Sequence, residues 1–275
     1  MATKIIWTYW HSEVTPRAVK YCMDSWRLHN PDWTIVLVTP KNLRDLLPNL
    51  TRELSDSHAQ TSDLVRVSLL VEYGGLWMDA TIYLHQSLDS WLPTHYHFVG
   101  YYLDGWTVSG SKHPVIENWF MYSQPNTVFM KRVLEELHRG YGRRTAYVAS
   151  LDQGKLQRIP VYLRVYLWMH LAIQKVLQEN DIKDYKVFRA EDDAYRLHVE
   201  HNWSAEHVVR AHMTGDDSGN RVTKFRGGER KCLEKAVSGQ AVWTKGETVG
   251  IGIALVVTLS VALRFRYYSP GDGTG

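Results

Sequence analysis

The chain has 275 residues, of which 44% are hydrophobic and 22% charged, and its formal net charge is +3. These values are normal for a globular protein and exclude a disordered or collagen-like chain. The two cysteines exclude a disulfide framework, and the mixed charges lack the long Lys/Arg run typical of a nucleic-acid groove. The length is enough for one large α/β domain or two small domains.

The first forty residues alternate between strand and helix patterns. Residues 4–8 and 34–38 are short apolar runs rich in β-branched side chains, which predict buried strands. Between them, residues 16–29 carry apolar side chains at helical spacing behind an early proline, which predicts a helix. Because a strand–helix–strand unit is typical of a parallel sheet, we expect a mostly parallel sheet flanked by helices.

The next segment, residues 62–81, combines both patterns. Residues 63–73 predict a helix that Gly74 and Gly75 end, and residues 76–84 predict a strand. On that helix Asp63 and Arg66 share a face, because they are three residues apart. Because side chains of a strand alternate between its two faces, every second residue of the predicted strand shares one face, and the residues between them, on the other face, are all apolar. The first face carries Trp77, Asp79 and Thr81.

The rest of the chain predicts further elements with long irregular connections. Residues 142–160 predict a loop, residues 181–199 a strand with loops, and the glycine-rich residues 216–229 a mobile charged segment. The remaining predictions are strands at residues 98–103 and 106–109 and helices at residues 113–120, 128–140 and 162–180.

An uncharged run of 16 residues, 248–263, lies near the end of the chain and is followed by Arg264 and Arg266. A membrane-spanning helix needs about 17–25 apolar residues, and flanking Arg and Tyr are typical of membrane interfaces. We therefore expect a catalytic domain at residues 1–240 and a C-terminal tail at residues 241–275 that associates with a membrane. A buried C-terminal helix or strand is the alternative. The rest of the protein is expected to be cytoplasmic, because the N-terminus has no signal-peptide pattern.

The two carboxylates, the guanidinium and the indole of residues 62–81 suggest a pocket for a metal-bound diphosphate with a sugar attached. A carboxylate holds Mg²⁺ or Mn²⁺ through hard oxygen ligands, and such an ion neutralises a leaving diphosphate. Asp63 and Arg66 can also hydrogen-bond sugar hydroxyls. A purely structural interpretation stays open, in which Asp63 and Arg66 form a buried ion pair and Asp79 caps the strand.

Four blocks of sequence occur in a fixed order: KIIW at residues 4–7, SW with HNPD at residues 25–32, SDLVR at residues 62–66 and YGGLWMDAT at residues 73–81. Together they resemble the capsular polysaccharide synthesis proteins and, more loosely, glycosyltransferase family 32 and the glucosyltransferase domains of large clostridial toxins. The resemblance is clearest over about the first 120 residues.

The resemblance implies a GT-A fold, a Rossmann-like sheet that binds a nucleotide sugar and a divalent metal. It also implies roles by position. Trp7 would pack on the nucleotide base, Asp63 and Arg66 would hold the donor sugar, and Trp77 would line the donor pocket. Asp79 would be the first Asp of an Asp-x-Asp metal motif.

The second Asp of that motif is replaced here by Thr81, a weaker and neutral ligand. We expect another residue to complete the metal shell, and His212 has a suitable place in the chain, with Asp216 and Asp217 as rivals. Two residues of the glycine-rich segment, Lys224 and Arg226, could clamp the diphosphate as a closing loop or simply belong to a flexible linker. Two lesser candidates are His11, for phosphate or acceptor, and Asp104, for an acceptor groove.

The sequence therefore predicts a hexosyltransferase that uses a nucleotide diphosphate sugar, a glycan acceptor and Mn²⁺ or Mg²⁺. The resemblance implies that the anomeric configuration is retained. Two alternatives stay open: a non-catalytic protein of the same fold that binds sugar nucleotides or glycans, and a membrane-tethered assembly subunit.

Overall fold

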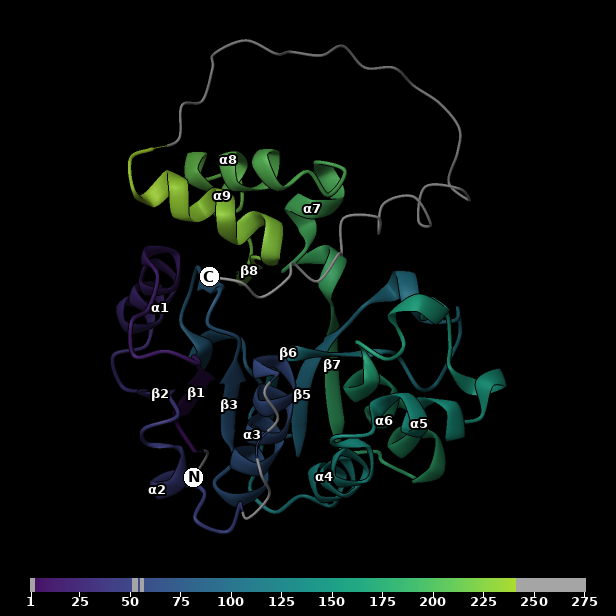
Figure 1. Ribbon diagram of the computed structural model, residues 1–275. Coiled ribbons are helices and arrows are strands. Elements are labelled where there is room, and N and C mark those ends of the chain that lie inside the picture. Colours follow the sequence, from purple (N-terminus) through teal and green to yellow (C-terminus); the bar gives the residue numbers. More distant parts are fainter. Residues whose placement is uncertain (1–2, 51–53, 55–56, 241–275) are drawn as a thin grey trace, which may run out of the picture.

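The computed structural model describes residues 3–50, 54 and 57–240. Helices and strands alternate along most of the chain, with short 3₁₀ turns between some of them (Figure 1). The elements are β1 (Ile5–Tyr9), α1 (Arg17–His29), β2 (Thr34–Val38), α2 (Leu43–Leu46), α3 (His58–Glu72), β3 (Gly75–Met78), β4 (Ile82–Leu84), β5 (Phe98–Tyr102), β6 (Ile116–Ser123), α4 (Val128–Gly140), α5 (Arg144–Ser150), α6 (Trp168–Glu179), β7 (Tyr185–Arg189), α7 (Arg196–Glu200), α8 (Ala205–Thr214), β8 (Val222–Lys224) and α9 (Gly227–Val237).

A central sheet has the strand order β2-β1-β3-β6-β5-β7. Strand β6 is antiparallel to both of its neighbours, and the other pairings are parallel, so five of the six strands run in one direction. The predicted mostly parallel sheet is therefore confirmed. The inner strands β3 and β6 are almost wholly buried, as expected for strands covered by helices on both faces.

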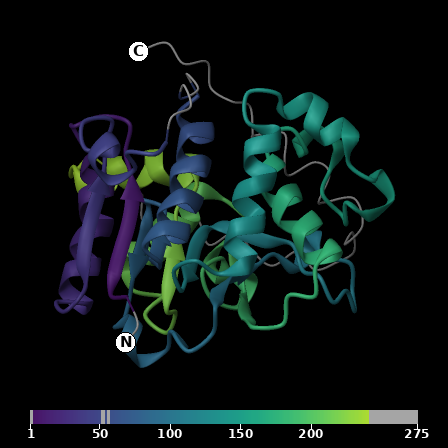
Figure 2. The ribbon, with the colours of Figure 1, turned by 90° about the horizontal axis from the view of Figure 1, so that it is seen from below.

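Helices cover both faces of this sheet. Helix α3 packs on β1, β3 and β6, α6 packs on β6, and α4 contacts both of these helices. Figure 2 shows α3 and α4 on the same side of the sheet. Helix α1 follows β1 and leads outward to β2, whereas α3 leads back to β3. Because such crossovers are right-handed, α1 and α3 lie on opposite faces.

The C-terminal helices α7, α8 and α9 lie beyond the carboxyl ends of β1 and β3 (Figure 1). Helix α9 packs on α8 and α1, and β8 forms a separate two-stranded antiparallel sheet with β4. Residues 222–224, near the end of the described chain, are thereby held against β4, the strand that follows β3.

Several sequence predictions are wrong in detail. The strand expected over residues 76–84 ends at Met78 and turns before β4. The strand expected over residues 106–109 does not form, and Trp106 instead ends a 3₁₀ turn. The helix expected at residues 113–120 is replaced by β6, because its aromatic residues are buried between two strands. Parts of the expected loop at 142–160 and of the expected mobile segment at 216–229 are ordered as α5, β8 and α9.

The predicted tail at residues 241–275, with its apolar run 248–263, lies outside the described residues. Within the described part of the chain, no helix combines the length and the apolar character that a membrane crossing requires. The tail and its membrane association therefore stay predictions.

Candidate active site

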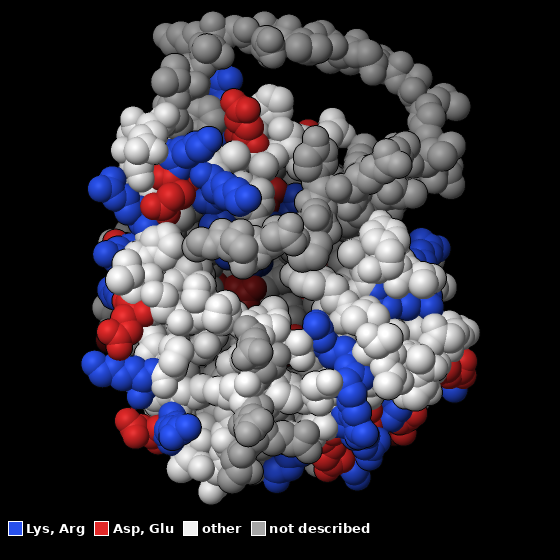
Figure 3. All heavy atoms as spheres, in the orientation of Figure 1, with Lys and Arg blue, Asp and Glu red and all other residues white. Residues whose placement is uncertain are grey.

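A cluster of four charged side chains lies at the carboxyl end of β3. On the face seen in Figure 3, a hollow opens near the middle of the molecule, with an acidic side chain at its floor and Lys or Arg atoms beside it. Strand β3 ends at Met78, but the amide of Asp79 still donates to the Trp119 carbonyl on β6, at 2.9 Å. The Asp79 carbonyl then accepts from Ile82 at 3.1 Å, which closes a turn. Asp79 is thus fixed at the edge of the sheet where ligands of open α/β folds bind.

Arg66 joins the helix and strand parts of the cluster. Its Nη1 donates to Asp63 Oδ1 at 2.7 Å, and its Nη2 donates to Asp79 Oδ1 at 3.1 Å. The guanidinium also lies 4.7 Å from the centre of the Trp77 ring, a favourable cation–π distance. The structure thus brings together Asp63 and Arg66, predicted to hold the donor sugar, with Trp77, predicted to line its pocket, and Asp79, predicted to bind the metal.

The close approach of helix and strand depends on the two glycines between them. Gly74 and Gly75 have φ values of +66° and +95°, which favour glycine. A Cβ atom on Gly75 would lie 2.7 Å from the Ile5 carbonyl oxygen on the neighbouring strand. The chain can therefore turn directly from α3 into β3, and Arg66 reaches the far end of that strand.

Lys224 completes the cluster from a distant part of the chain. Its Nζ donates to Asp79 Oδ2 at 2.7 Å, while the Trp77 indole donates to Asp79 Oδ1 at 3.1 Å. The Asp79 side chain is 29% exposed, compared with 12% for Asp63, 9% for Lys224 and 4% for Arg66. Asp79 is therefore the group of this cluster most accessible to a ligand.

The two carboxyl groups of the cluster differ in their electrostatics. Burial raises the pKa of Asp63 above its ordinary value, despite the opposing charge of Arg66. Burial also acts to raise the pKa of Asp79, but the nearby charges of Lys224 and Arg66 outweigh it and hold the pKa below its ordinary value. Asp79 therefore stays ionised, and Asp63 is the acid of the pair that takes up a proton more readily.

Asn118 also belongs to the site, although its sequence context gave no signal for it. It lies on β6, and its Nδ2 donates to Asp63 Oδ1 at 3.2 Å. The Arg66 Nε is buried without a hydrogen-bond partner. The side chains around Arg66 therefore leave one of its donors unused.

Two predicted donor-binding residues have other contacts. Trp7 is 3% exposed, and its indole donates to the Gly74 carbonyl at 2.8 Å and packs on Tyr73. In this conformation it presents no ring face to a nucleotide base. Thr81 is 4% exposed, and its hydroxyl donates to the Phe225 carbonyl at 2.7 Å. The stacking role of Trp7 and the ligand role of Thr81 stay predictions.

His212 lies in a second cluster, on the other side of β8. Its Nδ1 is 2.6 Å from Asp217 Oδ2, and its Nε2 is 3.0 Å from the Tyr21 hydroxyl. His85 Nε2 lies 3.2 Å from the same Asp217 oxygen, to which Thr223 donates at 2.6 Å. Since neighbouring residues of a strand point to opposite faces, Thr223 and Lys224 separate this cluster from Asp79.

The second cluster, formed by His85, His212 and Asp217, could hold a metal ion by its ligand types, since the ligand atoms lie within 4.8 Å of one another. Burial acts to raise the pKa of Asp217, but hydrogen bonds from both histidines outweigh it and hold the pKa far below its ordinary value.

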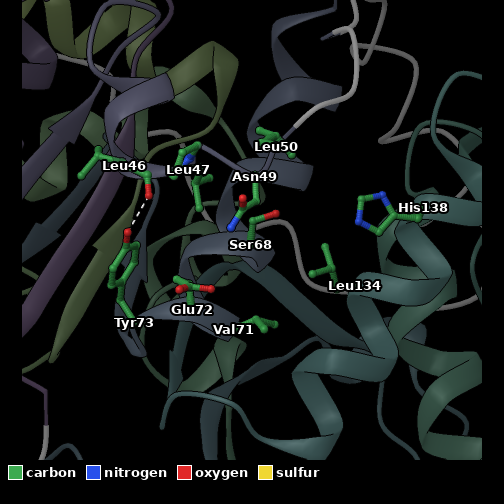
Figure 4. A pocket seen from close by; sticks show the side chains of 11 residues that line it. Leu46, Leu47, Asn49, Leu50, Ser68, Val71, Glu72, Tyr73, Leu134 and His138 are labelled. Carbon is green, nitrogen blue, oxygen red and sulfur yellow. Dashed lines mark hydrogen bonds between the residues drawn. The ribbon is translucent and has the colours of Figure 1, made fainter.

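A pocket of about 310 Å³ lies at the other end of α3 (Figure 4). Glu72 and Tyr73 line it, so it borders the start of β3, whereas Asp79 follows the end of β3. The Tyr73 hydroxyl donates to the Leu46 carbonyl at 2.6 Å, as Figure 4 shows. This pocket is therefore separate from the charged cluster at Asp79.

Two curated glycosyltransferases are similar to this chain in sequence. Glycosyltransferase afumC of Aspergillus fumigatus is 26% identical over 180 residues, which are 58% of this chain and 46% of that protein. O-glycosyltransferase braB of Annulohypoxylon truncatum is 27% identical over 154 residues, 48% of this chain and 36% of that protein. The chain thus spans less than half the length of either curated relative.

Among solved structures, the PaToxG glycosyltransferase is similar with a TM-score of 0.41 and 12% identity, over 86% of this chain and 87% of that one. The sequence model of the capsular polysaccharide synthesis proteins matches residues 1–151, which include β1, α3, β3 and the cluster residues Asp63, Arg66 and Asp79. This match covers more than half of the chain, and the chain therefore belongs to the capsular polysaccharide synthesis protein family.

Proposed function

We propose that the protein is a glycosyltransferase of the GT-A type, which transfers a hexosyl group from a nucleotide diphosphate sugar to a glycan acceptor. One observation carries the proposal: Arg66 binds both Asp63 from α3 and Asp79, which directly follows β3, and the Asp79 side chain is 29% exposed. The family match and the two glycosyltransferase relatives support a transferase activity.

The pocket offers suitable chemistry for a donor sugar. Carboxylates accept hydrogen bonds from sugar hydroxyls, and the guanidinium donates in a fixed geometry. The buried Trp77 ring packs against the Arg66 guanidinium, and Asp79 is the most exposed acceptor. We assign the donor sugar to this pocket and expect retention of the anomeric configuration.

The family resemblance also implies Mn²⁺ or Mg²⁺ at Asp79, with His212 as a further ligand. The described residues around Asp79 do not fit such an ion. Both Asp79 oxygens already accept hydrogen bonds, one of them from an ammonium group. Both ring nitrogens of His212 have protein partners on the other side of β8.

Nucleotide release tests the proposal. Purified full-length protein would be incubated with UDP- and GDP-sugars, glycan acceptors and Mn²⁺, and the freed nucleoside diphosphate would be measured. We expect release with at least one donor and its loss in Asp79→Asn, because the amide removes the charge without changing the shape. Asp181→Asn is the matched control, since Asp181 lies on the surface and pairs with an exposed lysine. Donor binding without turnover across the whole panel would instead identify a sugar-nucleotide-binding protein.

Membrane association through residues 248–263 is a separate part of the proposal. We expect the full chain to fractionate with membranes and a chain lacking residues 241–275 to be released, because the uncharged run would supply the apolar contact. Equal membrane fractions for the two chains would refute the attachment without affecting the proposed reaction.

A further inference from the structure

The reaction proposed above requires a positive charge at the leaving group. The bond between the sugar C1 and the β-phosphate oxygen breaks, and its electron pair stays on the phosphate. The acceptor hydroxyl oxygen forms the new bond to C1, and its proton passes to that phosphate oxygen. Negative charge therefore grows on the diphosphate in the transition state, and either a divalent metal or a Lys/Arg side chain can stabilise it.

Asp79, which occupies the metal-binding position of the family motif, is engaged by protein cations. Its Oδ2 lies 2.7 Å from Lys224 Nζ, and its Oδ1 lies 3.1 Å from Arg66 Nη2. A Mg²⁺ ion binds carboxylate oxygen at about 2.0–2.1 Å, so an ion on Oδ2 would lie against the ammonium group. Two cations on one oxygen repel each other strongly in a site that is largely shielded from water.

Thr81 explains why the ammonium group is held at this place. Its hydroxyl donates to the Phe225 carbonyl at 2.7 Å, and its own carbonyl accepts from the Phe225 amide at 2.9 Å. Phe225 directly follows Lys224, which pairs in register with Ile82 in the small sheet. The residue that replaces the second metal-binding Asp thus ties down the strand end that carries Lys224.

A carboxylate at position 81 could not make the same contact. An ionised Asp only accepts hydrogen bonds, and its oxygen would face the Phe225 carbonyl oxygen, which also only accepts. Thr81 and the position of Lys224 over Asp79 are therefore linked through Phe225. Thr81 is a positioning residue that acts through Phe225.

Lys224 also has donors left for a ligand. An ammonium group carries three N–H donors, and within the described part of the chain Lys224 Nζ makes one hydrogen bond, to Asp79. The two acids and two bases of the cluster balance to zero charge, so Lys224 can turn toward an incoming diphosphate while Arg66 still compensates Asp79.

We propose that Lys224 takes the place of the divalent cation: its ammonium group stabilises the leaving diphosphate, and transfer does not require a metal ion. This inference rests on the proposed transferase function. It makes Lys224 a catalytic residue, fixed by Thr81 and oriented by Asp79 before the donor binds.

Metal removal is the direct test. Nucleotide release by the full-length protein would be measured after dialysis against EDTA and again after Mn²⁺ or Mg²⁺ is added. We expect the same rate in both conditions. A rate that is lost in EDTA and restored by either ion would overturn the inference and leave the proposed function intact. No release in any condition would instead count against the proposed function.

Variants of Lys224 and Thr81 test the assigned roles. Lys224→Met keeps the length of the side chain without its charge, and we expect kcat to fall about 100-fold, as when one oxyanion donor is removed. Added ethylammonium should restore part of the activity of Lys224→Ala, an effect that a merely structural lysine would not show. Thr81→Ser keeps the hydroxyl and should keep the activity, and Thr81→Val should lower it. Full activity of a folded Lys224→Met variant would refute the role of Lys224.

Discussion

Replacing Arg66 with methionine would test whether the charged cluster is a closely coupled unit. Arg66 contacts Asp63 at 2.7 Å and Asp79 at 3.1 Å, and its side chain is 4% exposed. Methionine fills a similar volume but removes both ion pairs. Asp79 would keep Lys224 as a partner, whereas Asp63 would lose its only charged hydrogen-bond donor among the described residues.

The magnitude follows from burial. Removing one partner of a buried ion pair costs about 3–5 kcal/mol, because the other charge stays buried without compensation. The lost contact with the more exposed Asp79 adds at most about 1 kcal/mol. We therefore expect Arg66→Met to lower the free energy of unfolding by about 3–5 kcal/mol at neutral pH.

Urea unfolding measures this change, and a second substitution shows its origin. In the Arg66→Met/Asp63→Asn double variant the buried charge is gone, so much of the lost stability should return. The control is Arg27→Met, whose partner Asp24 lies on the surface, and it should cost less than about 1 kcal/mol. A loss for Arg66→Met no larger than that of the control would refute the reasoning, and so would a double variant as unstable as the single one.

Two further measurements probe the supports of the site. Burial acts to raise the pKa of Asp217, but hydrogen bonds from His212 and His85 outweigh it and hold the pKa below its ordinary value of 3.8. The stabilisation is therefore present above that value and is lost as the pH falls through the lower folded-state pKa. The urea midpoint should therefore fall more steeply on acidification in the wild type than in Asp217→Asn; equal slopes would show that this network does not contribute. Gly75→Ala should cost about 1–3 kcal/mol more than Gly110→Ala, because both glycines have positive φ but only the Gly75 Cβ would meet backbone. Equal melting temperatures for the two variants would contradict the close strand contact.

The part of the site that could be predicted from sequence is the part that is local in the chain. Asp63 and Arg66 are one helical turn apart, and the glycine pair brings them back to Trp77 and Asp79. Helical periodicity and the glycine turn therefore suffice to predict this half. The helix expected at residues 113–120 was wrong because a strand buried on both faces has no simple alternation, and Asn118 was missed with it.

Lys224 shows what such reasoning could not predict. It lies 145 residues beyond Asp79, in a glycine-rich charged stretch whose composition is typical of a mobile loop. The stretch is ordered because β8 pairs with β4, and a three-residue strand gives almost no periodic signal of its own. The sequence therefore predicts a closing loop or a flexible linker at this position, whereas Lys224 lies on a strand.

Thr81 illustrates the same limit from the side of chemistry. Compared with the family motif, it is a missing ligand, since a hydroxyl binds a divalent ion more weakly than a carboxylate does. In the structure the same hydroxyl donates a short, buried hydrogen bond that an ionised carboxylate could not donate, and its acceptor is the residue after Lys224. Thr in place of Asp at position 81 thus weakens a metal site at the leaving group but helps to position the Lys224 ammonium group there. Since Thr81 and Phe225 are 144 residues apart in the sequence, only the fold shows that the residue at position 81 is connected to the position of Lys224.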